Sequence, residues 1–179
     1  CTIYLPHSKD GSFVKQIIVC SSSSVISKRF AFSSYDKLLF SNLLNAENQI
    51  NELTNSLKIS TKFLRPSMIY GQLDSYNDKS ISVLLSLLRL FPIVFLPTQT
   101  GLRQPIHVDQ LSKVAIFYIE EYMDNNFPEE ENQFILLGGD VEISYKKMIV
   151  LLQNSLHRKD QGRKCVIITI PNKLFYTLL

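Results

Sequence analysis

Four consecutive serines, Ser21 to Ser24, are the first residues in the chain whose side chains could take part in catalysis or ligand binding. They follow Phe13–Cys20, a largely apolar, β-branched run that is typical of a buried strand ended by turn-forming residues. A hydroxyl at the end of such a strand can both donate a hydrogen bond to a substrate and accept one from it. The simpler alternative is that the serines only terminate the strand.

Arg103 and His107 are the next candidates. A planar, permanently charged guanidinium binds phosphate oxygens in bidentate fashion, so Arg103 could hold a phosphorylated ligand; the alternative is a surface salt bridge. His107 titrates near neutrality and could serve as a base, although we favour a structural role. No metal site is predicted, because the three cysteines, Cys1, Cys20 and Cys165, include no Cys-x-x-Cys pair and no nearby histidine.

The elements that must position these residues begin with a helix from Tyr35. Its apolar residues fall at 35, 39, 43, 46, 50, 53 and 57, the alternating steps of an amphipathic helix. A strand over Ser60–Tyr70 follows, interrupted at Arg65 and Pro66 because proline removes a ladder donor. Strand, long crossover helix and strand favour a parallel sheet, with the serines at its carboxyl edge.

The rest of the chain continues to alternate helices and strands. Glu129 to Glu131 is expected to be a solvated loop, and Ser144 suits the N-cap of a helix that runs to about Leu156. The other expected elements are helices at 81–90 and 108–122, a strand at 134–137 closed by two glycines, a strand at 166–170 and a helix opening at Pro171.

Composition narrows the class of protein. The chain has 179 residues, 45% of them hydrophobic and 20% charged, which suffices for a packed core. A net charge of +3 spread over 19 basic and 16 acidic residues, with no dense Lys/Arg block expected, gives no electrostatic footprint for nucleic acid, so no nucleic-acid partner is expected. No apolar run approaches the ~20 residues needed to span a bilayer, so no membrane partner is expected. The odd number of cysteines indicates no disulfide framework, so a reduced, cytoplasmic location is predicted.

Four segments in fixed order carry a resemblance to a known family: residues 18–25, the helix with Ala46-Glu47, residues 63–71 and residues 101–109. They resemble the strand-end serines, catalytic helix, Arg-Pro-x-x-x-Tyr-Gly turn and Arg-x-x-x-His-Val-Asp segment of extended short-chain dehydrogenase/reductase (SDR) enzymes of the nucleotide-sugar epimerase/dehydratase type. The resemblance implies an α/β fold: the C-terminal half of a Rossmann-like parallel sheet with a small α/β substrate-binding lobe. It places the NAD(P)-binding domain at 1–72 and the substrate lobe at 73–179, with core segments returning at about 104–137.

The resemblance also assigns residues to roles. Ser22 matches the catalytic serine that hydrogen-bonds the sugar hydroxyl, and Pro66 matches a turn beside the nicotinamide of NAD or NADP. The positions implied for substrate binding are Ser23, Ser24, Met68 and Arg103, with Arg103 on the nucleotide diphosphate. The Gly-rich dinucleotide site belongs to an N-terminal part of the family that we expect to precede Cys1.

The chain departs from the family where catalysis is concerned. The general-base Tyr and its Lys would fall at Leu39 and Leu43, and no Tyr in the chain has a Lys four residues later. Tyr35 and Lys37 cannot replace them, because residues two apart on a helix point in different directions. The chain is similar to a divergent branch of the family that lacks this pair, so whether it is an enzyme stays open.

Two functions are therefore carried forward. The first is an NAD(P)-dependent epimerase/dehydratase-like protein acting on a nucleotide sugar. The second is a catalytically silent relative that binds a nucleotide or nucleotide sugar, or serves as an assembly partner. The resemblance allows a homodimer through the helix at 35–57, and it gives His107 and Asp109 the structural role of starting the next helix, with Asp109 as its cap.

Overall fold

The computed structural model describes residues 14–73, 76–77, 79–124 and 132–177, so Phe13 and the acidic stretch 129–131 lie outside the described residues. The chain divides into two compact units. Unit 1 comprises residues 1–67 and 109–138, and unit 2 comprises residues 68–108 and 139–179. The domain limits expected from the sequence, 1–72 and 73–179, stay a prediction.

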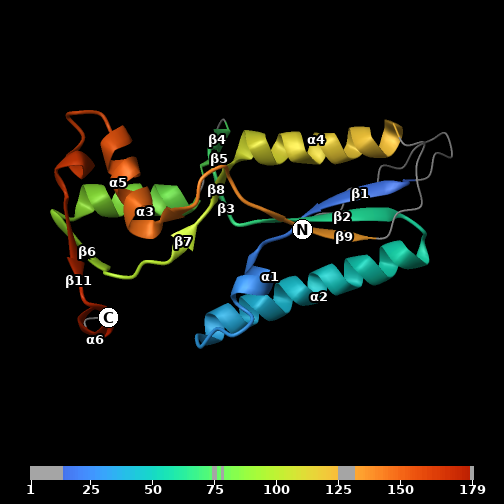
Figure 1. Ribbon diagram of the computed structural model, residues 1–179, viewed down its shortest axis with the longest axis horizontal. Coiled ribbons are helices and arrows are strands. Elements are labelled where there is room, and N and C mark those ends of the chain that lie inside the picture. The colour runs from blue at the N-terminus through green and yellow to red at the C-terminus, as the bar shows by residue number, and fades with distance from the viewer. Residues whose placement is uncertain (1–13, 74–75, 78, 125–131, 178–179) are drawn as a thin grey trace. The chain divides into compact units, whose positions relative to one another are not determined.

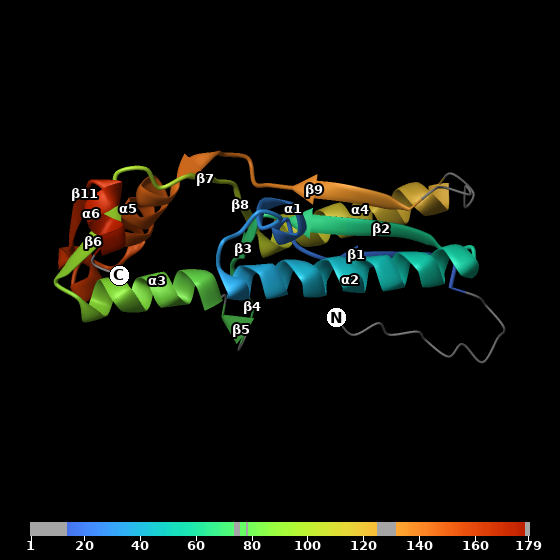
Figure 2. The same cartoon turned by 90° about the horizontal axis from the view of Figure 1, so that it is seen from below.

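Unit 1 is built on a parallel sheet in the order β1-β2-β9, formed by β1 (Gln16–Cys20), β2 (Ser60–Pro66) and β9 (Gln133–Leu137). Gln16 pairs with Ser60, and Lys62 pairs with Gln133. The helices α2 (Ser34–Ser56) and α4 (Val108–Asp124) cover opposite faces of this sheet (Figures 1 and 2). The strand, helix, strand prediction and its parallel pairing are thereby confirmed.

The apolar core of unit 1 is small and lies where the central strand meets α2. Val19, Ile50 and Phe63 form it, with Ile17 packed against them. Phe63 is completely buried, and its ring stacks on Phe134 of the neighbouring strand at 4.6 Å between centroids. This contact ties β2 to β9 beyond the ladder hydrogen bonds.

Helix α2 forms as predicted, but its buried face is not the predicted apolar stripe. Tyr35, Leu53 and Leu57 are exposed, whereas the buried residues are Glu47, Ile50 and Thr54. Polar groups can occupy this face because each has a partner; the Thr54 hydroxyl, for example, donates to the Ile50 carbonyl at 2.9 Å. The hydrophobic pattern therefore predicts the helix correctly, but it predicts only part of the face that is buried against the sheet.

The C-terminal end of α2 is held to the sheet by Asn132. Its side-chain amide donates to Asn51 Oδ1 at 2.8 Å and to Thr54 Oγ1 at 3.2 Å, while its oxygen accepts from the Thr61 amide at 2.8 Å. One side chain thus links the helix, the start of β2 and the residue before β9. Such a satisfied network fixes the helix on the sheet without adding apolar area.

Unit 2 packs two helices on one face of a two-stranded parallel sheet. Strand β6 (Ile93–Pro97) pairs with β11 (Val166–Ile170), and α3 (Lys79–Leu90) and α5 (Tyr145–Ser155) contribute to the same core. Strand β6 was not predicted, although its sequence is apolar and β-branched. The buried residues of the apolar cluster that these elements share are Leu84, Leu88, Leu96, Met148, Ile149 and Cys165.

The remaining elements are short. In unit 2, β3 (Met68–Tyr70) pairs with β8 (Pro105–His107) in parallel, and β7 (Leu102–Arg103) pairs with β10 (Ile143–Ser144) in antiparallel fashion. The others are α1 (Ser24–Ser27) in unit 1 and β4 (Gln72–Leu73), β5 (Tyr76–Asn77), the 3-10 helix η1 (Gln161–Lys164) and α6 (Asn172–Thr177) in unit 2.

The predicted strand over Ser60–Tyr70 proves to be two strands. Strand β2 ends at Pro66, which has no amide hydrogen to continue a ladder, and the Ser67 amide instead donates to the Leu137 carbonyl at 2.9 Å. Strand β3 then starts at Met68 in the other unit.

The prediction that Ser144 caps the N-terminus of a helix is confirmed, because Ser144 Oγ accepts from the Lys147 amide at 3.1 Å at the start of α5.

Candidate functional site

The serine tract lies at the carboxyl edge of the unit 1 sheet, where open α/β sheets bind ligands. The Ser21 amide donates to the Leu64 carbonyl at 2.7 Å and the Ser23 amide to the Pro66 carbonyl at 2.9 Å. The tract therefore extends the β1 ladder along the end of β2 before α1 begins at Ser24. Its backbone position is set by the sheet itself.

Ser22 has a hydroxyl that is held in place and retains a proton to donate. Its Oγ accepts a hydrogen bond from the Ser24 amide at 3.1 Å, a local serine turn, and the residue is half-buried. Accepting a bond leaves the hydroxyl hydrogen for a ligand. Ser23 occupies the N-cap position of α1 without a side-chain cap bond. The roles given to Ser22, Ser23 and Ser24 remain predictions.

Directly beside these serines is a buried polar network that the sequence did not reveal. Ser21 Oγ donates to Glu47 Oε1 at 2.5 Å, and Arg65 grips the same carboxylate with Nε on Oε1 at 2.9 Å and Nη2 on Oε2 at 2.5 Å. Glu47 is only 2% exposed. The Arg65 guanidinium also lies over the Phe134 ring, 4.3 Å from its centroid.

Glu47 is therefore a positioning group and not a substitute base. Its oxygens already accept three charge-assisted or hydroxyl hydrogen bonds, and its charge is matched by Arg65. What the network does is tie the end of β1, the end of β2 and α2 together at the edge that carries Ser22.

Leu39 and Leu43 lie about two turns and one turn, respectively, before Glu47 on α2, on the same side of the helix by their spacing. Both side chains are half-buried. Neither can transfer a proton, so the position where the family carries its base is occupied by hydrocarbon. Along this side of α2, two leucine side chains are thus followed by the carboxylate of Glu47, which is ion-paired with Arg65.

Pro66 and Met68 are two residues apart but belong to different units. Pro66 is buried at the end of β2 in unit 1. Met68 opens β3 in unit 2, where its side chain packs against the core that also contacts Tyr145. Their predicted contacts, with cofactor for Pro66 and with substrate for Met68, remain predictions.

Arg103 stands exposed on β7 in unit 2. Its Nη1 donates to its neighbour's carbonyl, Leu102 O, at 2.8 Å, and within the described residues no carboxylate forms an ion pair with it. Burial raises the pKa of the adjacent Tyr145 hydroxyl, while the charge of Arg103 acts in the opposite direction. The surface salt bridge that we considered as the alternative has no described partner.

His107 has a structural setting. It ends β8 opposite Tyr70, and the two rings meet edge to face at 5.1 Å. Gly71 lies against it with φ of +130°, and a Cβ there would come within 2.9 Å of the imidazole, so glycine is needed. Helix α4 begins at Val108, so Asp109 lies in its first turn rather than at the cap position that the resemblance implied.

The residues present do not fit a complete dinucleotide site. The six glycines of the chain include no Gly-x-x-Gly-x-x-Gly turn to cradle a pyrophosphate, and α2 offers no proton-transferring side chain at 39 or 43. We therefore derive no reaction step through NAD or NADP. Among the residues described, no group of three His, Cys, Asp or Glu side chains could hold a metal ion.

No protein-family model matches the chain, and a comparison with curated proteins finds no significant match. Solved structures do share its fold. A UDP-glucuronic acid 4-epimerase from Bacillus cereus matches with a TM-score of 0.61 at 17% identity over 88% of this chain and 50% of that one. A UDP-glucose 4-epimerase from Brucella ovis matches with a TM-score of 0.59 at 14% identity, over 88% and 53%.

A GDP-D-glycero-L-gluco-heptose synthase from Campylobacter jejuni has a TM-score of 0.58 at 15% identity, over 91% of this chain and 64% of that one. The chain thus spans between half and two thirds of the length of these proteins. The resemblance to extended SDR proteins is confirmed at the level of the fold: a Rossmann-like α/β architecture with parallel sheets.

Proposed function

We propose that this chain forms the nucleotide-sugar-binding face of an epimerase/dehydratase-like protein of the extended SDR type and that it lacks the hydride-transfer chemistry of that family. Arg103 carries the proposal: an exposed guanidinium on a strand, with no described acidic partner, in a fold shared with proteins named for UDP- and GDP-linked sugars. A diphosphate supplies pairs of charged oxygens that the planar guanidinium can bind in bidentate fashion.

The other predicted site residues take supporting roles in this proposal. Ser22 donates its remaining proton to a sugar hydroxyl, and Ser23 and Ser24 contact the same ligand. Met68 provides an apolar contact. Because a likeness below one fifth identity supports the fold and not the ligand, the kind of sugar is left to experiment.

An active NAD(P)-dependent epimerase or dehydratase is the second candidate. The placement of Ser22 at the carboxyl edge of the sheet favours it, since this hydroxyl still has a proton to donate. Leu39 and Leu43 argue against it, because a base must reach its proton at hydrogen-bond distance and neither side chain has a titratable atom. A homodimer and a cytoplasmic location accompany either candidate as predictions.

One experiment separates binding from turnover. The chain is incubated with UDP- and GDP-linked sugars, with and without NAD⁺ or NADP⁺, and ligand contact is followed by saturation-transfer NMR while the sugar anomeric signals report conversion. We expect saturation transfer to at least one nucleotide sugar and no new anomeric signal. Conversion of a sugar would establish the second candidate, and an absence of any transfer would refute both.

A further inference from the structure

Strand β11 is one edge of the two-stranded sheet of unit 2, and it takes no part in the proposed sugar-nucleotide site. At one end of the strand the Val166 amide donates to the Pro92 carbonyl at 2.8 Å, and at the other end the Thr98 amide donates to the Ile170 carbonyl at 2.9 Å. Successive residues of a strand direct their backbone groups to opposite sides. The even-numbered residues of β11 therefore bond to β6, and the odd-numbered residues face away from it.

Two residues of β11 thus present free backbone groups at this edge. The amides and carbonyls of Ile167 and Thr169 point away from β6, and within the part of the chain that the structure describes none of them forms a hydrogen bond. Figure 1 shows β11 at the left-hand margin of unit 2, and its sheet has no strand beyond it. A row of unpaired groups on an edge strand is a template for pairing with another chain.

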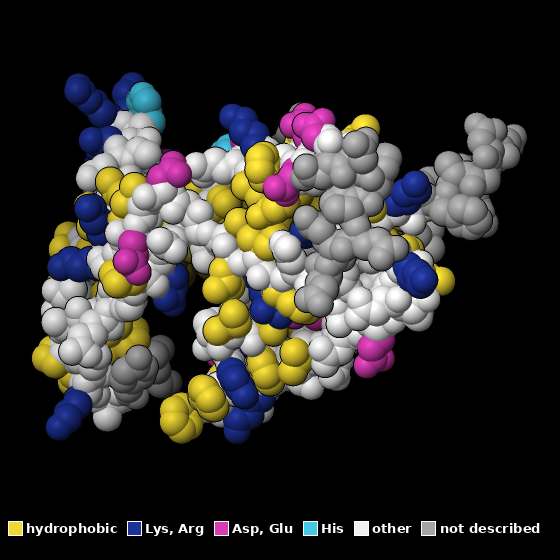
Figure 3. Space-filling model, turned by 45° about the vertical axis from the view of Figure 1, so that its right-hand side comes forward, with side chains coloured by type: hydrophobic (Ala, Val, Ile, Leu, Met, Phe, Trp, Pro, Cys, Tyr) yellow, Lys and Arg dark blue, Asp and Glu magenta, His cyan; other side chains and the backbone are white. Residues whose placement is uncertain are grey.

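The edge of β11 lacks the features by which proteins protect exposed strands. Its five residues, Val166–Ile170, are all β-branched and include no proline and no charged residue. Basic side chains that precede the strand, in a group at the upper left of Figure 3, do not interrupt it. The other edge of the sheet differs, because β6 ends in Pro97, which has no amide hydrogen. The edge of β11 is therefore the better site for a further strand.

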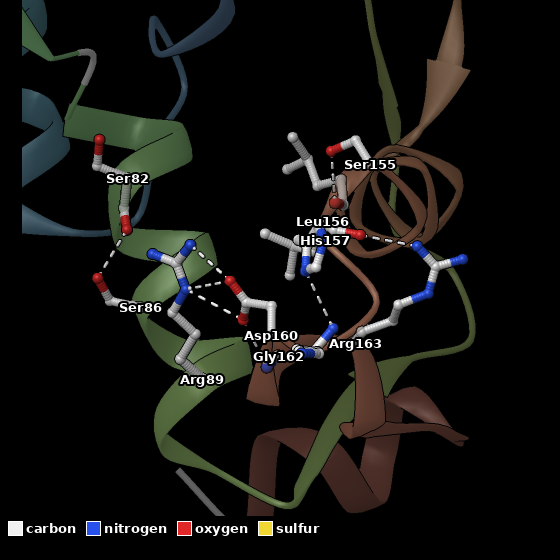
Figure 4. Close-up of polar contacts among 11 residues, drawn as sticks. Ser82, Ser86, Arg89, Ser155, Leu156, His157, Asp160, Gly162 and Arg163 are labelled. Atoms are coloured by element: carbon white, nitrogen blue, oxygen red, sulfur yellow. Dashed lines mark hydrogen bonds and ion pairs between the residues drawn. The ribbon is translucent and has the colours of Figure 1, made fainter.

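The turn that leads into β11 is held in place by side chains. Asp160 accepts from Arg89 Nη2 at 2.9 Å and from the Gly162 amide at 2.9 Å (Figure 4). Gln153 Nε2 donates to the Cys165 carbonyl at 2.6 Å, directly before the strand begins. The edge is therefore ordered before it binds, which lowers the entropy lost on association.

The outer face of the same sheet is apolar and exposed. Helices α3 and α5 cover the other face, where Leu96 is buried. On the outer face Ile93 and Phe95 of β6 are 44% and 49% exposed, and Val166 and Ile168 of β11 are 53% and 37% exposed. Among the described residues no helix is long and apolar enough to cross a membrane, and this apolar surface belongs to a sheet. A parallel sheet with one face open to water is unusual, and a two-stranded one is only marginally stable by itself.

We propose that β11 pairs in antiparallel fashion with β11 of a second copy of this chain, so that the two sheets join into one of four strands. A twofold axis perpendicular to the sheet brings identical strands together in this order. With the axis at Ile168, Ile167 of each copy lies opposite Thr169 of the other. Residues opposed in this way exchange two hydrogen bonds, so the free groups of both edges are satisfied.

The side chains at this edge are complementary to themselves, which favours a second copy as the partner. Around the same axis Ile168 faces its own counterpart, and Val166 faces Ile170 of the other copy. No like charges meet, because the strand carries none, and β-branched side chains opposite one another stabilise a sheet. This interface is separate from the homodimer through the helix at 35–57 that the family resemblance allows.

Sedimentation velocity of the full chain, over a wide range of concentration, tests the proposal. We expect a reversible equilibrium between monomer and dimer. T169P removes an outward-pointing amide hydrogen and leaves the ladder to β6 intact, at the kind of edge position where proline is tolerated. It should weaken dimerisation by at least about tenfold, because each copy loses a hydrogen bond to the other. The control F95K adds a charge to the outer face on β6, away from the edge, and should leave the equilibrium nearly unchanged.

A disulfide tests the register. Ile168 and its counterpart would form a non-hydrogen-bonded pair, whose Cα atoms lie about 4.5 Å apart, within the range that a disulfide spans. In a C1S/C20S background, I168C should form a disulfide-linked dimer with oxidised glutathione. The matched control I93C places a cysteine on the same face of β6 and should not.

Three results would overturn the proposal: a monomer at every concentration, dimerisation of T169P equal to that of the wild type, or as much cross-linking in I93C as in I168C. If circular dichroism shows that T169P does not fold, the two cysteine variants decide. A dimer that L53K, on the exposed side of α2, abolishes would also overturn it, in favour of the helix interface.

Discussion

The two units use charge in opposite ways. In unit 1 the charged groups near the candidate site are buried and matched to each other, as in the Glu47 and Arg65 pair with Ser21. In unit 2 the candidate ligand-binding cation, Arg103, is exposed and has no described acidic partner. The comparison teaches that unit 1 uses its charged pair to hold strand ends in place, whereas unit 2 leaves Arg103 on the surface, as the proposed function requires.

Removal of the Arg65 side chain should have the largest effect on stability, because it would leave the Glu47 carboxylate buried and unpaired. Breaking a buried pair from one side costs about 3–5 kcal/mol, so R65M should lower the free energy of unfolding by an amount in that range. Urea denaturation measures it. The control is K28A, which removes the partly exposed partner of Asp36 and should cost less than about 1 kcal/mol.

The double variant E47M/R65M sharpens the same comparison. Because it removes both charges together, it should be more stable than R65M alone. If R65M were no more harmful than K28A, the buried network would not be what holds the strand ends, and the contrast between the units would fail.

Leu39 and Leu43 give a smaller expected effect. Both are half-buried, so the double change L39Y/L43K should be tolerated with a loss of stability below about 1.5 kcal/mol, since a long Lys stem can carry its ammonium to water. Thermal denaturation and a reduced-nicotinamide absorbance assay with a nucleotide sugar measure stability and any restored turnover. A large drop in melting temperature without turnover would show that these leucines are packed core and would contradict this prediction.

Substitution of Asp160 should have the smallest effect on the free energy of unfolding, and only at acidic pH. Arg89 holds the pKa of this carboxyl below its usual value, helped by the Gly162 amide. A lowered folded-state pKa means that the stabilisation is present above the ordinary Asp pKa and is lost as pH falls through the folded value. D160N should therefore flatten the acid limb of the stability profile slightly, as measured by urea denaturation at a series of pH values.

The fold was largely predictable because its signals are local. The β-branched run before Ser21 and the periodicity from Tyr35 gave strand and helix, and the long crossover between strands gave parallel pairing. Helix α5 was placed by Ser144, whose side chain does cap it. Strand β6 was missed, because a short, continuous apolar run after Pro92 shows no alternation and cannot be told from a buried helix segment by periodicity alone.

The candidate site was less predictable because its contacts join distant parts of the sequence. Glu47 and Arg65 are 18 residues apart, and nothing in the pattern of α2 marks a glutamate as buried. Arg65 had been assigned only to the turn before Tyr70. The pairing of Arg89 with Asp160 spans 71 residues and was equally invisible in the sequence.

Isothermal titration calorimetry of nucleotide-sugar binding to the R103A variant is the most direct test of the contrast between the units. UDP- and GDP-linked sugars are titrated into the wild type, R103A, R103K and the control R158A, an exposed arginine elsewhere in unit 2. A hydrogen bond to a charged group contributes about 1.5–3 kcal/mol, so R103A should bind at least about tenfold more weakly, and R103K should fall between because an ammonium lacks the bidentate fork. R158A should match the wild type. Equal affinity of R103A and the wild type would contradict the account, as would the absence of binding in all four proteins.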